Sequence, residues 1–297
     1  FAASVKSVAR PNEAALGLGF VVGQRSSLPA DLDNDLRMIG LTHIVVASGY
    51  NLTILVRFAR RLLARWSRFL ATGMSGVLMF GFALFSGFSA SMNRAVLVTG
   101  LSLAAWHVGR RFHPLMLIIY ASALTAYLNP NYIWGDVGWY LSFLAFGGVL
   151  IVAPLISKVI LRADKPNSLA QVVIETLAAQ IMTLPLILLI FGQLPNLAVV
   201  ANALVAPVIP LSMLATTIAG LIGMLAPWLA GVAGLMMHFT VGYVLAVVDW
   251  LSSVPGAQSL ISLPAAWLVL VYGSIIIASG LVWWLTRHDF LESSVVD

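Results

Sequence analysis

Long, predominantly apolar stretches constrain this 297-residue chain more than any other feature of its sequence. Four of them run from Phe69 to Phe88, Val137 to Ile156, Val172 to Phe191 and Pro264 to Leu285. Each is close to the roughly 20 residues that an α-helix needs to cross the hydrocarbon core of a bilayer. The strands of membrane β-barrels alternate polar and apolar residues, and these stretches do not. We therefore expect an α-helical membrane protein.

The composition supports the same class of protein. Hydrophobic residues make up 60% of the chain and charged residues 9%, and the mean hydropathy is +0.97. A soluble domain of this size would need far more charge to cover its surface. The chain has no cysteine, and its five histidines show no ligand spacing. We expect neither a metal nor another cofactor.

The basic residues cluster in the connections between the apolar stretches. Basic clusters lie at residues 57–68, 110–111, 158–165 and at Arg287, and the first contains Arg57, Arg60, Arg61, Arg65 and Arg68. Because lysine and arginine favour the cytoplasmic side, clusters on alternate connections predict a polytopic all-α bundle of about nine segments. The N-terminus would lie outside and the C-terminus inside. A DNA-binding patch is the alternative explanation of the arginine cluster.

This pattern predicts three regions along the chain. They are an extracytoplasmic N-terminal segment at 1–38, a transmembrane domain at 39–286 and a cytoplasmic tail at 287–297. Within the second, residues 197–225 are too long for one ordinary span and contain two prolines. We expect a broken or re-entrant helix there, because proline interrupts the helical hydrogen bonds. The chain does not begin with Met, so we expect a piece of a longer protein.

The stretch from about Ile39 to Val56 contains polar groups that an ordinary span would lack. His43 and Ser48 suggest an intramembrane serine hydrolase, and Asn51 follows. On a continuous helix His43 and Ser48 would lie about 140° apart and could not share a proton. No Gly-x-Ser-x-Gly elbow is present either. We therefore expect no catalytic residue and no enzyme activity, and a helix that is close-packed or lines a channel.

Arg94 is the second polar outlier. Its guanidinium stays charged, so within a membrane it must face a protein partner, water or an anion. An arginine that lines an anionic path and one that reaches the lipid headgroups are both compatible with the sequence. Gln180 places a further polar group on an apolar stretch, where side chains of this type often join helices.

Several patches, in one order along the chain, resemble the competence domain of the ComEC family. The family's Gly-Leu-x-His signature, which ends in Ser-Gly, is matched by Gly40, Leu41, His43, Ala47, Ser48 and Gly49. The other similar patches are Gly23–Leu28, Ser91–Ala95, Gly138–Ala145, the group Gln180, Thr183 and Pro185, and the pair Asn202 and Pro207. Tyr50, Asn51 and Tyr140 depart from the usual pattern, in which leucine, histidine and glutamine occupy these positions.

The resemblance implies a channel that passes single-stranded DNA across the bacterial cytoplasmic membrane during natural transformation. Arg94 would serve phosphates, and Tyr50, Trp139, Tyr140 or Phe143 would stack on bases. The path would also include His43, Ser48, Asn51 and Gln180. Ordinary packing or an interfacial aromatic belt is the alternative role of the aromatic residues.

The expected partners are single-stranded DNA, the lipid bilayer, an extracytoplasmic DNA receptor and a cytoplasmic ATP-driven motor, because the chain has no phosphate-binding Walker loop. Assembly with further copies of the chain is also open. The main rival function is a secondary transporter of a small anion, in which Arg94 and the broken 197–225 segment form a midplane site. An intramembrane hydrolase is third.

Overall fold

The computed structural model describes residues 1–23, 28–45, 49–87, 90–110, 113–161 and 168–286. These residues are mostly helical, and the backbone divides into two compact units. Unit 1 comprises Phe1–Leu55, Val77–Phe88 and Pro195–Gln258, and unit 2 comprises Val56–Gly76, Ser89–Leu194 and Ser259–Asp297. Two helices, α5 (Gly49–Leu63) and α6 (Arg68–Ser86), contribute residues to both units.

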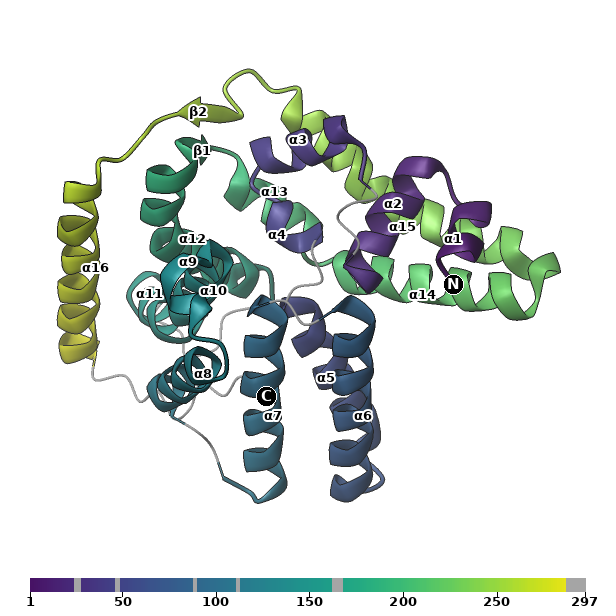
Figure 1. The fold of residues 1–297 in the computed structure, drawn as a ribbon, viewed down its shortest axis with the longest axis horizontal. Helices are drawn as coiled ribbons and strands as arrows, with labels where there is room; N and C mark the ends of the chain where they lie inside the picture. The colour runs from purple at the N-terminus through teal and green to yellow at the C-terminus, as the bar shows by residue number, and fades with distance from the viewer. Residues whose placement is uncertain (24–27, 46–48, 88–89, 111–112, 162–167, 287–297) are drawn as a thin grey trace. The chain divides into compact units, whose positions relative to one another are not determined.

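Unit 1 is built on a pair of helices from the C-terminal half of the chain. Its helices are α1 (Ala2–Val8), α2 (Pro11–Val22), α3 (Ala30–Met38), α4 (Thr42–Val45), α13 (Ala198–Val205), α14 (Ile209–Leu225) and α15 (Ala230–Ser252). α14 and α15 pack side by side, and α1 and α2 lie against both of them (Figure 1). Phe20 and Met237 are fully buried in this core. At Gly17 a Cβ would lie 2.7 Å from Met237 Cε, so the absence of a side chain lets α2 approach α15 closely.

The predicted broken helix at 197–225 is confirmed. α13 and α14 are separated by residues 206–208 and bent by 51°. Pro207 and Pro210 lack the N–H group that a continuous helix would require. The break is nevertheless held within the protein, because Val208 N donates to Val205 O and Tyr243 Oη donates to Leu204 O at 3.3 Å. Backbone groups freed at membrane depth are tolerated only where the protein or water satisfies them.

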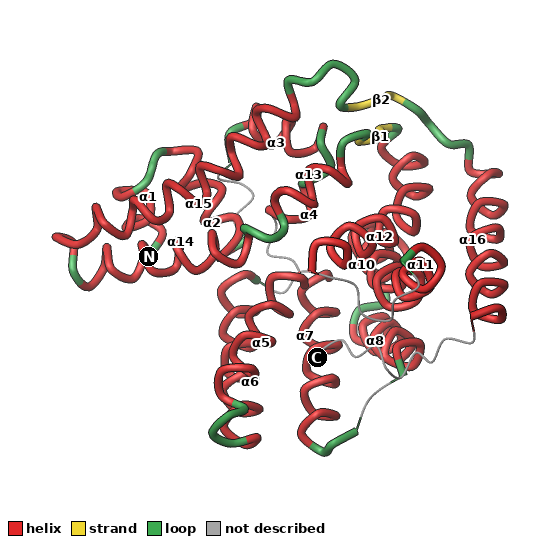
Figure 2. The backbone as a smooth tube through the Cα atoms, turned by 180° about the vertical axis from the view of Figure 1, so that it is seen from behind, coloured by secondary structure: helices red, strands yellow, loops and turns green. Residues whose placement is uncertain are grey.

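Unit 2 gathers the helices from the middle of the chain around α12 (Ser168–Phe191). The others are α7 (Ala90–His107), α8 (Pro114–Leu128), α9 (Asn131–Gly135), α10 (Val137–Gly147), the π-helical segment η2 (Gly148–Val152), α11 (Ala153–Ile160) and α16 (Ala265–Thr286). α12 packs against α10, η2, α11 and α16. Figure 2 shows α10 and α11 beside it. None of the residues of α16 is buried, as expected for a helix whose apolar surface meets lipid.

The π-helical segment lies at a close helix crossing. α10, η2 and α11 form one continuous apolar helix from Val137 to Ile160. At Gly148, where η2 begins, a Cβ would lie 2.5 Å from the carbonyl oxygen of Ala178 on α12. A glycine is therefore required for this contact. The wider π-helical turn of η2 begins at the same residue.

Fewer of the described helices are long and apolar enough to cross a membrane than the sequence predicts. By length and apolar composition, four helices among the described residues could cross a membrane: Val137–Ile160, Ala170–Phe191, Pro227–Ser252 and Ala265–Thr286. The bent pair α13 and α14 would make a fifth. The predicted count of about nine segments is thus not confirmed. The apolar parts of α6 and α8 are shorter than the length that this criterion requires.

The first predicted span, from about Ile39 to Val56, begins with a turn in the structure. Gly40 has a φ of 75°, a left-handed conformation that ends the preceding helical turn, and α4 begins only at Thr42. A Cβ at Gly40 would lie 2.8 Å from the Cβ of Ala198, so this turn packs against the start of α13. At the other end, α5 continues through the first arginines of the basic cluster to Leu63.

Replacing Gly148 should destabilise unit 2. In Gly148→Ala the new methyl group overlaps the backbone of α12, and overpacking of this kind typically costs about 1–3 kcal/mol. Gly147→Ala is the matched control, because a Cβ there meets nothing within 4 Å. We expect a lower thermal unfolding midpoint for the detergent-solubilised Gly148→Ala protein only. Equal midpoints for the two variants would contradict the close crossing.

Candidate functional site

Arg94 lies in the first half of α7 and is enclosed by aromatic rings of α10. Its guanidinium carbon is 5.9 Å from the ring centroid of Phe143 and 5.3 Å from that of Phe146. Its Nε is buried and has no hydrogen-bond partner among the described residues. No carboxylate in the described part of the chain forms an ion pair with it. Two aromatic faces attract the cation, but they leave its N–H donors without acceptors.

The rings around Arg94 belong to a longer row of contacts along α10. Trp139 lies 4.9 Å from Phe143 and 5.2 Å from Tyr140, measured between ring centroids. Together, Tyr140, Trp139, Phe143, Arg94 and Phe146 form what we call the aromatic row. The Tyr140 end of the row is accessible, since this side chain is 39% exposed. Phe143, farther along the row, is buried. The row thus leads from the surface of unit 2 to Arg94, whose residue is partly buried and whose Nε is buried.

Hydrogen bonds fix the orientation of this row. Trp139 Nε1 donates to Thr125 Oγ1 of α8 at 3.0 Å, and Tyr140 Oη donates to Ile133 O of α9 at 2.5 Å. The carboxylate of Asp136 caps α10 by accepting from Trp139 N at 3.0 Å. Bonds to α8 and α9 therefore position the rings of Trp139 and Tyr140.

Gln180 lies on α12, which packs against α10. Its Oε1 is buried and has no hydrogen-bond partner among the described residues. A buried acceptor without a partner is uncommon, and it often marks an unseen water or ligand. Within unit 2 the structure therefore contains Arg94, Trp139, Tyr140, Phe143 and Gln180 of the predicted path. Contacts run from Arg94 to Phe143, from Phe143 to Trp139 and from Trp139 to Tyr140.

The remaining predicted residues belong to unit 1. His43 is on α4, and its side chain is exposed. Asn51, on α5, is fully buried and donates from Nδ2 to Phe20 O at 3.4 Å. Ser48 and the side chain of Tyr50 lie outside the described residues. The predicted angle between His43 and Ser48 therefore stays a prediction.

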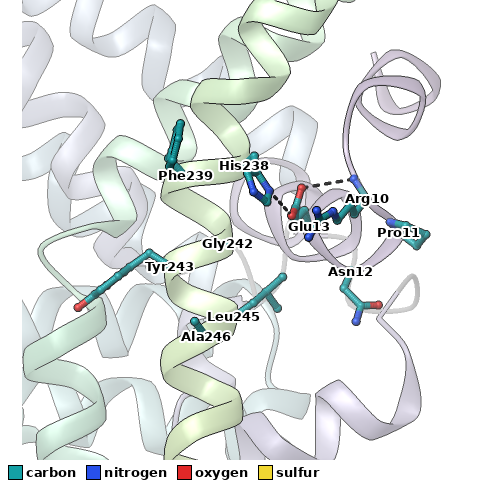
Figure 3. A pocket seen from close by; sticks show the side chains of 10 residues that line it. All are labelled: Arg10, Pro11, Asn12, Glu13, His238, Phe239, Gly242, Tyr243, Leu245 and Ala246. Carbon is teal, nitrogen blue, oxygen red and sulfur yellow. Dashed lines mark hydrogen bonds and ion pairs between the residues drawn. The ribbon is translucent and has the colours of Figure 1, made fainter.

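A second polar site, in unit 1, was missed by the sequence analysis. Glu13 on α2 and His238 on α15 are joined by a 2.7 Å contact between Glu13 Oε1 and His238 Nδ1 (Figure 3). Glu13 is buried, and its Oε2 accepts from Arg10 N at 3.3 Å. The pair borders a groove of about 710 Å³ that is also lined by Asn12, Phe239 and Tyr243. One carboxylate beside the long apolar run Ala14–Val22 was the signal that could have revealed it.

The described residues contain no group of three or more histidine, cysteine, aspartate or glutamate side chains that could hold a metal ion. The Glu13–His238 pair supplies two such side chains. The histidine of this pair is partly exposed, the carboxylate is buried, and their contact fixes the orientation of the imidazole.

Comparison with known protein families matches residues 20–286 to the Competence protein family. The chain belongs to this family. The matched region includes the Arg94 site and the broken helix, and it ends with α16. The family resemblance read from the sequence motifs is therefore confirmed.

Curated relatives agree with the family assignment. Competence protein ComA of Neisseria gonorrhoeae is 30% identical over 266 residues, which are 84% of this chain and 36% of that protein. ComE operon protein 3 of Bacillus subtilis is 23% identical over 220 residues, 73% of this chain and 27% of that protein. An uncharacterized protein of Aquifex aeolicus is 24% identical over 267 residues, 88% of this chain and 60% of that protein. The chain thus spans between about a quarter and three fifths of the length of these relatives. No solved structure matches it.

Removing the buried carboxylate of Glu13 should destabilise the packing of α2 on α15. Glu13→Ala leaves His238 without its partner and Arg10 N without its cap, and losses of this kind cost about 1–3 kcal/mol. Glu175→Ala is a suitable control, because Glu175 accepts one exposed bond from Gln171 on its own helix. The thermal unfolding midpoint of the purified protein would report the difference. An effect of Glu175→Ala as large as that of Glu13→Ala would contradict the special role of the buried pair.

Proposed function

We propose that this protein is a membrane channel that passes single-stranded DNA across the bacterial cytoplasmic membrane during natural transformation. The observation that carries the proposal is Arg94, a cation whose Nε is buried without a partner and which is flanked by Phe143 and Phe146. Membership of the Competence protein family supports the biological context.

The chemistry of a single strand matches this site. Each nucleotide carries one phosphate charge, so the strand cannot cross hydrocarbon without a polar path and sparse cations. An arginine guanidinium binds phosphate oxygens through two parallel N–H groups, and Arg94 keeps donors available for such a contact. One cation holds a moving strand weakly, whereas a dense cluster would trap it.

The aromatic row supplies the second element of single-strand recognition. Bases stack on aromatic faces without regard to sequence, because every base has a π face. Tyr140 is the accessible member of the row, while Phe143 is buried and holds Arg94. Bases therefore meet the Tyr140 end, and a phosphate meets the guanidinium. Gln180, with its free Oε1, adds a hydrogen-bond acceptor in the same unit.

The channel performs no bond-breaking chemistry in this proposal. Directional movement requires a source of energy, which we assign to a cytoplasmic ATP-driven motor. An extracytoplasmic receptor delivers the strand, and assembly with further copies of the chain is compatible with the exposed apolar surface of α16.

Transport of a small anion is the second candidate, and one observation favours it. The break between α13 and α14 resembles the discontinuous helices that form midplane substrate sites in secondary transporters. Ser212, on α14 close to this break, is fully buried, and its Oγ has no hydrogen-bond partner within the described ranges. Such a transporter would bind one small anion at this site.

Arg94→Ala should reduce uptake of fluorescent single-stranded DNA in cells that depend on this protein for DNA import. Loss of a hydrogen bond to a charged group costs about 1.5–3 kcal/mol, which corresponds to a decrease on the order of tenfold or more. Arg94→Lys keeps the charge and loses the planar fork, so we expect an intermediate rate. Arg65→Ala is the control for a lost charge, because Arg65 is exposed on the connection between α5 and α6.

The same variants separate the two candidate functions. Equal membrane abundance, measured by immunoblotting, must accompany the comparison of rates. If Arg94→Ala left DNA uptake unchanged while the protein supported the flux of a small anion such as phosphate, the transporter would replace the channel.

A further inference from the structure

The short helix α9 (Asn131–Gly135), between α8 and α10, presents aromatic residues to the surroundings. Trp134 is 86% exposed, and Tyr127, at the end of α8, is 83% exposed. Exposed aromatics of this size are unusual on a short connection that buries none of its own residues.

The connection is held in place although it is exposed. Tyr140 Oη donates to Ile133 O, and Asn93 Nδ2 of α7 donates to Tyr132 Oη at 3.3 Å. The side chain of Asn129 accepts from Asn131 N at 3.2 Å and shapes the turn into α9. These bonds tie α9 to α7 and α10 and hold its backbone in position. A ligand that binds the rings of α9 would therefore not have to order this segment first.

The same bonds connect α9 to the Arg94 site. Asn93, which bonds to Tyr132, directly precedes Arg94 on α7. Tyr140, which bonds to Ile133, is the accessible end of the aromatic row that leads to Arg94. Two independent contacts therefore place α9 next to the surface end of the candidate path.

We propose that α9 and the end of α8 form a stacking platform for unpaired nucleobases, with Trp134 as its main contact and Tyr127 and Tyr140 beside it. The inference rests on the proposed function, because it names where the strand is received before it reaches Arg94. Residues 129–136 contain no lysine or arginine, so the platform binds through base faces and leaves the phosphates to Arg94. The absence of basic residues also places this connection on the extracytoplasmic side.

Photocrosslinking tests the platform directly. The full chain in phosphatidylcholine nanodiscs is mixed with a single-stranded oligonucleotide that contains 5-iodouracil, irradiated, and mapped by peptide mass spectrometry. We expect crosslinks at Trp134 and its neighbours. Trp228, which is 79% exposed in unit 1, is the matched aromatic control and should not crosslink.

Equilibrium binding measures how much Trp134 contributes to the affinity for single-stranded DNA. Stacking of one base on an aromatic side chain contributes about 1–3 kcal/mol, so Trp134→Ala should raise the Kd for oligo-dT on the order of tenfold. Trp134→Phe should keep most of the affinity because it keeps a ring, and Trp228→Ala should not change it. Equal losses for Trp134→Ala and Trp228→Ala would overturn the platform.

A lipid-facing role for Trp134 is the competing outcome. Brominated phosphatidylcholine would then quench its fluorescence, and Trp134→Ala would leave DNA binding unchanged; that result would overturn the platform. Failure of the channel proposal is distinguishable from it. Crosslinks at Trp134 in a protein that passes no DNA would retain the platform and reject the channel, whereas DNA passage without these crosslinks would do the reverse.

Discussion

Hydrocarbon offers no hydrogen-bond partner to a polar group, and every notable feature of this protein depends on that constraint. It requires helices throughout the apolar stretches, because only a helix satisfies the backbone within one segment. Where the helix breaks between α13 and α14, the protein itself supplies partners, such as the hydroxyl of Tyr243 for Leu204 O. Where helices cross closely, as at Gly148, the glycine removes the side chain that would separate them.

The same constraint distinguishes the two polar sites. Glu13 forms hydrogen bonds with His238 and with the backbone N–H of Arg10 at the start of α2. Both carboxylate oxygens of Glu13 therefore already have partners within unit 1. Arg94 has aromatic faces instead of a carboxylate, and these stabilise the cation without occupying its donors. Because its donors are not occupied by a carboxylate of the protein, Arg94 can bind an anion that passes the site and release it again. This difference is why we place the functional path at Arg94 and treat the Glu13–His238 pair as a structural contact beside a groove.

Some of this organisation was predictable from local sequence. The helical class follows from the length of the apolar stretches, and the broken helix at 197–225 follows from its prolines. Arg94 was identifiable because a charge in an apolar segment stands out without knowledge of its neighbours. Trp139, Tyr140 and Phe143 were singled out through the family motif that contains them. Glu13 was missed, because its partner His238 lies 225 residues away and no local pattern joins them.

The amino-acid sequence by itself determined the class of the protein, its family and the most unusual of its charges, because composition, motif order and hydropathy are properties of the chain alone. Tertiary structure decided where helices begin, as at Thr42 after the left-handed turn at Gly40, and how many described helices are long enough to span. It also decided that the aromatic residues of α10 form one row with Arg94 and that α9 exposes Trp134 beside it. These outcomes depend on contacts between segments far apart in the chain, and such contacts are selected by packing and hydrogen bonding of the whole unit.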